Sequence, residues 1–165
     1  MLLSLFTTSA TELISLIVSF ALKYPAAAFQ LSGWHTAWSG QKTYNGVAII
    51  SKHELADVHT GLPGLPDDPQ RRVIAATVNG VRVVDVYCVN GEALGSEKFD
   101  YKRRWFAALT DFIRDEMSRH EKLVLLGDFN IAPLECDVYS HKALLKVVSH
   151  TPIEVETLGR LADAH

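Results

Sequence analysis

The sequence predicts an α/β fold, because short apolar runs typical of buried strands alternate with an amphipathic helix. GVAIIS (46–51), VIAATV (73–78) and VRVVDVY (81–87) are compact, rich in β-branched residues and bounded by polar or turn residues, as strands are. Residues 98–120 repeat apolar side chains every three or four positions, which indicates a helix with one buried face. The 165 residues are 48% hydrophobic and 21% charged, which is the balance of one soluble globular domain.

Residues 1–22 form an atypical apolar segment, which we separate from the domain expected at 23–165. Its only ionisable side chain is Glu12, and residues 13–22 are almost wholly apolar. A membrane-spanning helix requires roughly 20 uninterrupted apolar residues, and a secretory signal has basic residues near its start, but this segment has neither. We therefore expect no membrane contact, with a tether through residues 1–22 as the alternative.

The next part of the chain is expected to place one helix and one buried strand before a loop. YPAAAFQLSG (24–33) is typical of a short helix ended by its glycine, and an aromatic-rich segment then leads into the strand at 46–51. This strand shows no polar alternation, which predicts burial on both faces. GLPGLPDDPQ (61–70) is a loop, and Asn79-Gly80 predicts an antiparallel hairpin between the next two strands.

The helix at 98–120 is expected to bury one face and to expose a basic one. Its apolar face comprises Trp105, Leu109, Phe112, Ile113 and Met117, and its outward face carries Arg103, Arg104, Arg114 and Arg119. KLVLLGD (122–128) then predicts a short strand whose polar end opens into a loop. Thr151 followed by Pro152 predicts the start of a last helix.

Charge and cysteine usage narrow the class of protein. The net charge of −3 gives no general attraction to phosphate, so any nucleic-acid contact would need a local group of Lys and Arg. Cys88 and Cys136 belong to no CxxC pair or Cys/His cluster, so we expect reduced thiols in a cytoplasmic protein. The seven histidines form no HExxH motif, and no zinc site is predicted.

Polar residues follow two of the predicted strands and are candidates for chemistry. Asp128 and Asn130 stand where an apolar strand opens into a loop, so a carboxylate could orient or deprotonate water while an amide stabilises charge on a phosphoryl oxygen. The alternative is an Asx-turn that only ends the strand. Tyr87 ends another strand, and its phenol could bind a phosphate oxygen or lie half-buried with a solvated hydroxyl.

Gln70-Arg71-Arg72 enters a strand after a long loop and is the third candidate. Two guanidinium groups at such a position could clamp a backbone phosphate. An exposed loop pair without a ligand is the equal alternative.

Taken together, four segments resemble the exodeoxyribonuclease III family, part of the endonuclease/exonuclease/phosphatase superfamily, in order and spacing. They are GQKTYNGVAIIS, QRRVIAA, VVDVYCVNGE with EKFDYKRRWFAAL, and LVLLGDFNIAPLECDVY. The resemblance covers residues 24–139 and continues more weakly through TPIEVETLGRL. GDFNIAP and the segment around Tyr87 are its most specific parts.

The resemblance implies a partial four-layer α/β sandwich, two β-sheets flanked by helices, that hydrolyses DNA phosphodiester bonds with Mg²⁺ or Mn²⁺. The implied substrates are double-stranded DNA with abasic sites or 3′ ends. By position, Tyr87 would contact the scissile phosphate, Asp128 would orient or activate water, and Asn130 would stabilise the transition state. Asp128 and Asn130 would also contact the metal. The residues implied to hold the DNA are Arg71, Arg72 and Asn90.

Two motifs of the family have no counterpart in this sequence. A Gln-Glu-Thr stretch with the principal metal ligand is expected before Tyr24, where the sequence reads IVSFALK, and a closing Ser-Asp-His motif would lie beyond His165. We therefore expect a monomer truncated at both ends, which binds the metal weakly or not at all and is impaired or inactive as an enzyme. The alternatives are a non-catalytic DNA-binding or interaction remnant of the same fold, and a phosphatase or RNA-acting member of the superfamily.

Overall fold

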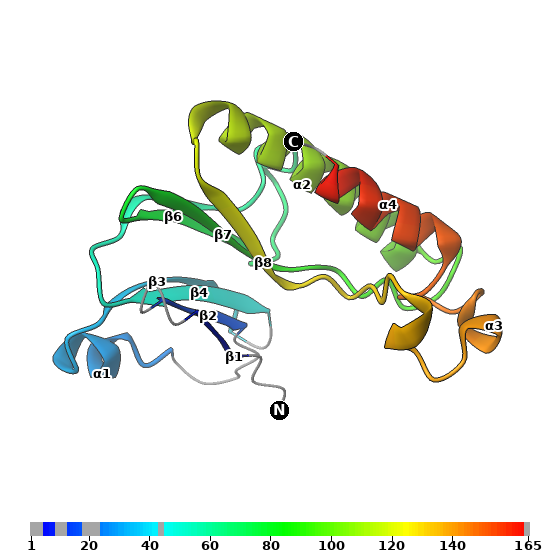
Figure 1. Ribbon diagram of the computed structural model, residues 1–165, viewed down its shortest axis with the longest axis horizontal. Coiled ribbons are helices and arrows are strands. Elements are labelled where there is room, and N and C mark those ends of the chain that lie inside the picture. The colour runs from blue at the N-terminus through cyan, green and yellow to red at the C-terminus, as the bar shows by residue number, and fades with distance from the viewer. Residues whose placement is uncertain (1–4, 9–12, 18–23, 43–44, 164–165) are drawn as a thin grey trace.

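The computed structural model describes residues 5–8, 13–17, 24–42 and 45–163. Two four-stranded sheets lie face to face, with helices on their outer sides (Figure 1). Helices α2 (Glu97–Arg119) and α4 (Pro152–Ala162) lie outside one sheet, and α1 (Ala26–Leu31) lies beside the other. The predicted partial four-layer α/β sandwich is confirmed.

The first sheet has the order β1-β2-β4-β3, with all neighbouring strands antiparallel. Its strands are β1 (Leu5–Thr8), β2 (Leu13–Ile17), β3 (His35–Gly40) and β4 (Gly46–Ser51). All six residues of β4 are buried, as predicted, because β2 and β3 flank it and apolar clusters cover both of its faces. β3 was not predicted, since its mixed aromatic and polar residues form no apolar run.

β1 and β2 both lie within the apolar segment 1–22. They pair with each other, and β2 pairs with β4 from Leu13 opposite Ser51 to Ile17 opposite Val47. The separation of this segment from the domain at 23–165 stays a prediction.

The second sheet has the order β5-β6-β7-β8 and contains the predicted hairpin. Its strands are β5 (Ala56–Thr60), β6 (Val73–Val78), β7 (Val81–Tyr87) and β8 (Leu123–Asp128). In the turn between β6 and β7, Asn79 (φ 48°) and Gly80 (φ 76°) both adopt the left-handed conformation that a two-residue hairpin turn favours. α2 then crosses the sheet and leads to β8, which pairs parallel with β7.

Apolar clusters fill both sides of this second sheet. Val84 and Val86 of β7 pack on the side of α2, and Val81 and Val83 pack on the side of the first sheet. Successive residues of a strand point to opposite faces, so Tyr87 continues the row that faces the first sheet, and it packs against that cluster. Tyr87 therefore lies between the two sheets at the end of β7.

Both long helices begin at capped ends. At the start of α2, Ser96 Oγ accepts a hydrogen bond from the Phe99 amide at 3.1 Å. At the start of α4, the predicted cap Thr151 forms a reciprocal capping box with Glu154. A 3₁₀ turn at Glu135–Asp137 and the short helix α3 (His141–Leu144) precede α4. None of the helices in the described part of the chain has the length and hydropathy to cross a membrane.

Candidate active site at the carboxyl edge of the second sheet

β7 and β8 end together, which brings the loops that follow them side by side. In the parallel register, Tyr87 lies opposite Asp128, and the amide of Cys88 donates to the Asp128 carbonyl at 2.8 Å. Leu126, two residues before Asp128, packs between the sheets, so strand alternation directs Asp128 to the side that Tyr87 occupies. The structure thus brings these two residues to one edge, and does not separate them.

Gly127 allows β8 to reach this edge beside β7. Its φ is 131°, and a Cβ built there would lie 1.9 Å from the carbonyl oxygen of Val86, its partner in the register. No side chain fits at that distance. The glycine before Asp128 is therefore a requirement of the strand pairing.

Asn130 is held by hydrogen bonds from four of its atoms. Its amide N donates to Asp128 Oδ1 at 2.8 Å, and its Nδ2 donates to the Cys88 carbonyl at 2.9 Å. Its Oδ1 accepts from Asn90 Nδ2 at 3.4 Å, and its carbonyl accepts from Lys102 Nζ at 2.9 Å. The bond from the Asn130 amide to Asp128 Oδ1 is the Asx-turn that the sequence left as an alternative. The turn is present, and both of its residues also lie at the edge where β7 and β8 end.

Arg72 lies against Tyr87 instead of extending into solvent. Its guanidinium stands 4.6 Å from the centre of the Tyr87 ring, and Nη1 donates to the Tyr87 carbonyl at 2.9 Å. Its Nε donates to Gln70 Oε1 at 2.5 Å. Arg71 is exposed, and its backbone amide donates to Gln41 Oε1 at 3.2 Å. The two arginines thus differ in surroundings, and the predicted phosphate clamp stays a prediction.

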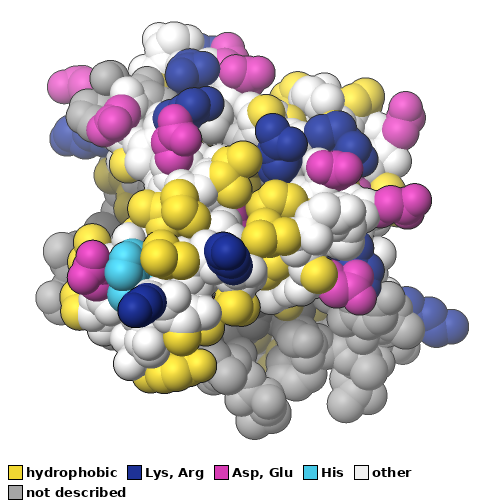
Figure 2. Space-filling view, turned by 90° about the vertical axis from the view of Figure 1, so that its right-hand side faces the viewer, with side chains coloured by type: hydrophobic (Ala, Val, Ile, Leu, Met, Phe, Trp, Pro, Cys, Tyr) yellow, Lys and Arg dark blue, Asp and Glu magenta, His cyan; other side chains and the backbone are white. Residues whose placement is uncertain are grey.

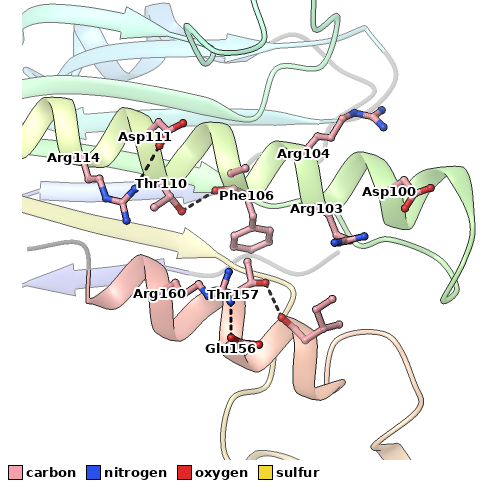
Figure 3. A pocket seen from close by; sticks show the side chains of 12 residues that line it. Asp100, Arg103, Arg104, Phe106, Thr110, Asp111, Arg114, Glu156, Thr157 and Arg160 are labelled. Atoms are coloured by element: carbon pink, nitrogen blue, oxygen red, sulfur yellow. Dashed lines mark hydrogen bonds and ion pairs between the residues drawn. The ribbon is translucent and has the colours of Figure 1, made fainter.

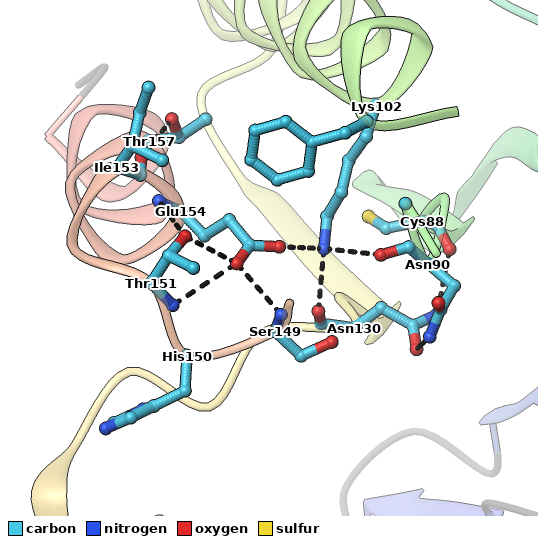
Figure 4. Close-up of polar contacts among 12 residues, drawn as sticks. Cys88, Asn90, Lys102, Asn130, Ser149, His150, Thr151, Ile153, Glu154 and Thr157 are labelled. Carbon is cyan, nitrogen blue, oxygen red and sulfur yellow. Dashed lines mark hydrogen bonds and ion pairs between the residues drawn. The ribbon is translucent and has the colours of Figure 1, made fainter. Parts of the chain in front are cut away.

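Lys102 and Glu154 complete this edge, and the sequence interpretation did not include them. Lys102 Nζ donates to the carbonyls of Asn90 and Asn130 and to Glu154 Oε1 (Figure 4). Both side chains are almost fully buried. A signal was present, because Lys102 follows Phe99 by three residues on the buried face of α2, where a charged side chain is rare without a partner.

The electrostatics of this edge are visible at Cys88. Burial, and then the negative charge of Asp128, raise the pKa of the Cys88 thiol well above its ordinary value, while the charges of Lys102 and Arg72 act in the opposite direction. Cys88 is therefore a protonated, buried thiol at neutral pH. Cys88 and Cys136 are both free cysteines.

Metal ligands are few in the part of the chain that the structure describes. In that part, no group of three or more His, Cys, Asp or Glu side chains could hold a metal ion. Asp128 is the one predicted site residue with a carboxylate, and one of its oxygens accepts the Asn130 amide. Divalent cations of the Mg²⁺ type take six oxygen ligands, several of them often water. The described residues alone therefore do not form a divalent metal cage.

A separate groove of about 720 Å³ lies between α2 and α4 (Figure 3). Part of the predicted basic face of α2 lines it, and these side chains are exposed as expected. Arg114 Nη1 lies 3.5 Å from Asp111 Oδ1, and Arg160 Nη2 of α4 lies 2.6 Å from Glu156 Oε1. On the side of the molecule shown in Figure 2, basic and acidic side chains are likewise interspersed around hydrophobic ones. Arg114 of the α2 face and Arg160 of α4 thus each have an acidic neighbour.

The sequence matches known proteins over most of its length. Residues 8–145 match the Endonuclease/Exonuclease/phosphatase family. An exodeoxyribonuclease from Bacillus subtilis (strain 168) is 31% identical over 137 residues, which are 82% of this chain and 54% of that protein. The chain spans about half the length of the curated relatives it matches.

Two solved structures share the fold and much of the sequence. A 3′ phosphatase from Neisseria, solved with a product DNA hairpin, is 58% identical with a TM-score of 0.90, and the match covers 93% of this chain and 60% of that one. An AP endonuclease from Archaeoglobus fulgidus is 31% identical with a TM-score of 0.84, over 92% of this chain and 60% of that one.

Proposed function

Because the chain belongs to the endonuclease/exonuclease/phosphatase family, in its exodeoxyribonuclease III and AP endonuclease branch, we propose that it carries the phosphate-handling part of a DNA-repair phosphodiesterase. The observation that carries this proposal is the register of β7 and β8, which ends in Tyr87 opposite Asp128. The proposed substrate is double-stranded DNA with abasic sites or 3′ ends. We further propose a cytoplasmic monomer.

The side chains at the carboxyl edge suit the attack of water on a phosphodiester. The Tyr87 phenol would donate to a phosphate oxygen, and Asp128 would orient or deprotonate the attacking water. Asn130 would donate a hydrogen bond to the charge that develops on the phosphoryl oxygen, and its four-point fixation suits a preorganised donor. Asn90 and the arginines Arg71 and Arg72 would contact the DNA backbone.

A divalent cation, Mg²⁺ or Mn²⁺, would neutralise phosphate charge in this family's reaction when it is bound. In this chain we propose that Asp128 and Asn130 bind it weakly or not at all, because among the described residues no group of three or more His, Cys, Asp or Glu side chains could hold a metal ion. Each missing acid, base or ligand typically lowers the rate about 10²- to 10⁴-fold. The chain is therefore proposed to be impaired or inactive as an enzyme.

Cleavage of an abasic-site duplex with added Mg²⁺ tests the proposal. The experiment compares this chain with Asp128→Ala, using Lys98→Met on the exposed side of α2 as the matched control. We expect slow cleavage by the parent chain and by Lys98→Met, and a loss of about 10²-fold or more in Asp128→Ala. Measurable cleavage at equal rates by all three proteins would remove Asp128 from the assigned role.

The relative from Neisseria favours a second activity at the same edge. That protein is described as a 3′ phosphatase, and it is 58% identical to this chain. Removal of a phosphate from a DNA 3′ end uses the same attack of water on phosphorus, with a different leaving group. Duplexes that carry a 3′ phosphate, offered beside the abasic-site duplex, distinguish the two activities by which substrate is consumed.

A non-catalytic DNA-binding remnant is the alternative to an enzyme. The arginines that could bind DNA differ in their surroundings: Arg114 and Arg160 have acidic neighbours, Arg72 lies against Tyr87, and Arg71 is exposed. A DNA-binding remnant would show duplex affinity that falls steeply as salt rises, since phosphate contacts release counterions. Duplex binding measured over a range of salt concentrations, without added metal, separates the two hypotheses.

A further inference from the structure

Lys102 is a buried lysine whose ammonium group is fully committed to three acceptors. It is 1% exposed, although it stands on α2 among apolar residues that face the core. Its Nζ lies 3.1 Å from the Asn90 carbonyl, 2.9 Å from the Asn130 carbonyl and 2.5 Å from Glu154 Oε1. An ammonium group has three N–H donors, so each donor has one partner.

Glu154 ties this ammonium group to the start of α4. While Oε1 accepts from Lys102, Oε2 accepts from the Ser149 amide at 2.8 Å and from Thr151 Oγ1 at 2.6 Å. The carboxylate is 4% exposed. Its charge is thus compensated by one cation and several N–H and O–H donors, which is the condition for a stable buried ion pair.

The pair reaches two loops that strand pairing alone leaves independent. Asn90 follows β7 and Asn130 follows β8, and both lie beyond the last paired residues of the strands. Lys102 binds the carbonyls of both residues, and Figure 4 shows its ammonium group between Glu154 and Asn90, with Asn130 below it. Beyond Lys102, Asn130 Nδ2 donates to the carbonyl of Cys88, which follows β7, at 2.9 Å, and a longer contact of 3.4 Å joins the two side-chain amides.

The backbone of Asn130 also needs such a restraint. Its φ is 49°, in the left-handed region that non-glycine residues seldom adopt. Asp128 fixes its amide N and Lys102 fixes its carbonyl, so both ends of the residue are bonded in this conformation. Loss of either bond removes one of the two restraints on this backbone conformation, and with it part of what positions the side-chain amide.

We propose that Lys102, held by Glu154, is a positioning residue that sets the Asn90 and Asn130 amides relative to each other in the candidate active site. The inference rests on the proposed function for its consequence in catalysis, but its geometric part is testable without activity. As a positioning residue, Lys102 would touch neither the substrate nor the reacting atoms. It acts through the two carbonyls that it binds.

The first test is the NMR signals of the side-chain amides of Asn90 and Asn130, assigned with Asn90→Asp and Asn130→Asp. In Lys102→Met, both signals should shift, and in Lys102→Arg, which keeps the charge and the donors, they should return toward the parent positions. Lys98→Met is the control, because Lys98 lies on the same helix and pairs with exposed Glu92 at 3.1 Å. Unshifted signals in folded Lys102→Met overturn the proposal.

A second variant keeps the proposal testable if Lys102→Met does not fold. Lys102→Met combined with Glu154→Gln removes both charges, so no uncompensated charge stays buried. The amide signals of this double variant should shift as in the single variant. Signals at the parent positions in a folded double variant overturn the proposal in the same way.

The catalytic consequence is tested on the chain with whichever DNA substrate the parent cleaves. Lys102→Met should lower kcat about 10- to 100-fold with a smaller change in KM, because a misplaced group affects the transition state more than binding. If the parent is inactive, as the proposed function allows, the amide signals alone decide the geometric role. An active parent with unchanged kcat in Lys102→Met overturns the catalytic role alone.

Discussion

Two buried ion pairs anchor α2, and they are matched in burial but not in what else they bind. Lys102–Glu154 lies near the start of the helix, and Arg82–Glu116 near its end, with every side chain at most 4% exposed. Arg82 also donates to the Asp57 carbonyl at 2.7 Å, so this pair joins α2 to the strands of the second sheet. Lys102 instead binds two loops at the candidate active site.

A buried and paired charge can therefore support either the fold or a functional site, and its burial alone does not distinguish the two roles. Both pairs should be costly to break, because either broken pair leaves a charge buried. Of the two cations, only Lys102 makes further contacts with residues of the candidate active site, Asn90 and Asn130.

The largest effect is expected for Gly127→Ala, which disrupts the pairing of β7 with β8. A Cβ at this position would lie 1.9 Å from the Val86 carbonyl oxygen, so β7 and β8 would have to separate. We expect a loss of about 4 kcal/mol or more in the free energy of unfolding, or no folded protein. Urea unfolding followed by circular dichroism measures it. A stability close to that of the parent would show that the β7–β8 pairing adjusts easily, so that it does not fix Tyr87 opposite Asp128.

The next largest effect is expected for Arg82→Met, which breaks the Arg82–Glu116 pair and leaves the Lys102–Glu154 pair intact. Removing the guanidinium leaves Glu116 buried with Arg119 Nη2, 2.6 Å from Oε1, as a remaining partner, so we expect a loss of about 3 kcal/mol, at the low end for a broken buried pair. The amide signals of Asn90 and Asn130 should stay at their parent positions in Arg82→Met. If Arg82→Met and Lys102→Met move these signals equally, the distinction between the two pairs is wrong.

A smaller, pH-dependent effect is expected from Cys88, which lies at the same end as Lys102. Its raised pKa means that above the ordinary thiol value of 9.0 the folded chain keeps a proton that the unfolded chain loses. Stability should therefore fall as pH rises beyond that value, by up to about 1.4 kcal/mol per pH unit, and Cys88→Ala should reduce this slope. Thermal unfolding at a series of alkaline pH values measures both proteins.

The matched thiol Cys136 provides the control for this prediction. It is exposed, whereas Cys88 is buried, so a thiol reagent at mildly alkaline pH should modify Cys136 first. Rapid modification of Cys88 in the folded chain would contradict the burial on which the slope depends.

The smallest effect is expected for Ser96→Ala at the start of α2. Ser96 Oγ caps the helix through the Phe99 amide and donates to the Gly91 carbonyl at 3.0 Å. Loss of a cap costs about 1 kcal/mol. Ser96 connects the start of α2 with Gly91 in the loop after β7. Urea unfolding measures the loss of stability, and the NMR signal of the Asn90 side-chain amide shows whether the cap also positions that loop. An unshifted signal would leave the positioning to Lys102.

Much of the second sheet was predictable because its signals are local. Asn79-Gly80 marks the hairpin by its own conformational preference, and the apolar spacing of residues 98–120 marks the helix before any contact is known. The strands β3 and β5 and the short helix α3 were missed, because their residues form no apolar run or period. Their conformations depend on neighbouring strands and loops.

The candidate site was predictable in its strand-end residues but not in its restraints. Tyr87, Asp128 and Asn130 stand at recognisable strand ends, whereas the partner of Lys102 lies 52 residues further along the chain. The contact of Arg72 with Tyr87 was likewise not readable from the sequence, which suggested an arginine free for phosphate. Exposure and pairing of a charge are properties of the packed molecule.

The sequence by itself determined the α/β class, the hairpin, the long helix and the family, because propensity, periodicity and motif spacing act over a few residues at a time. Only the tertiary structure decided that Tyr87 and Asp128 share an edge, that Arg72 lies against an aromatic ring, and that Lys102 bonds two loops. The physical reason is that these outcomes depend on strand register and on which distant groups meet once water is excluded, and no local segment contains that information.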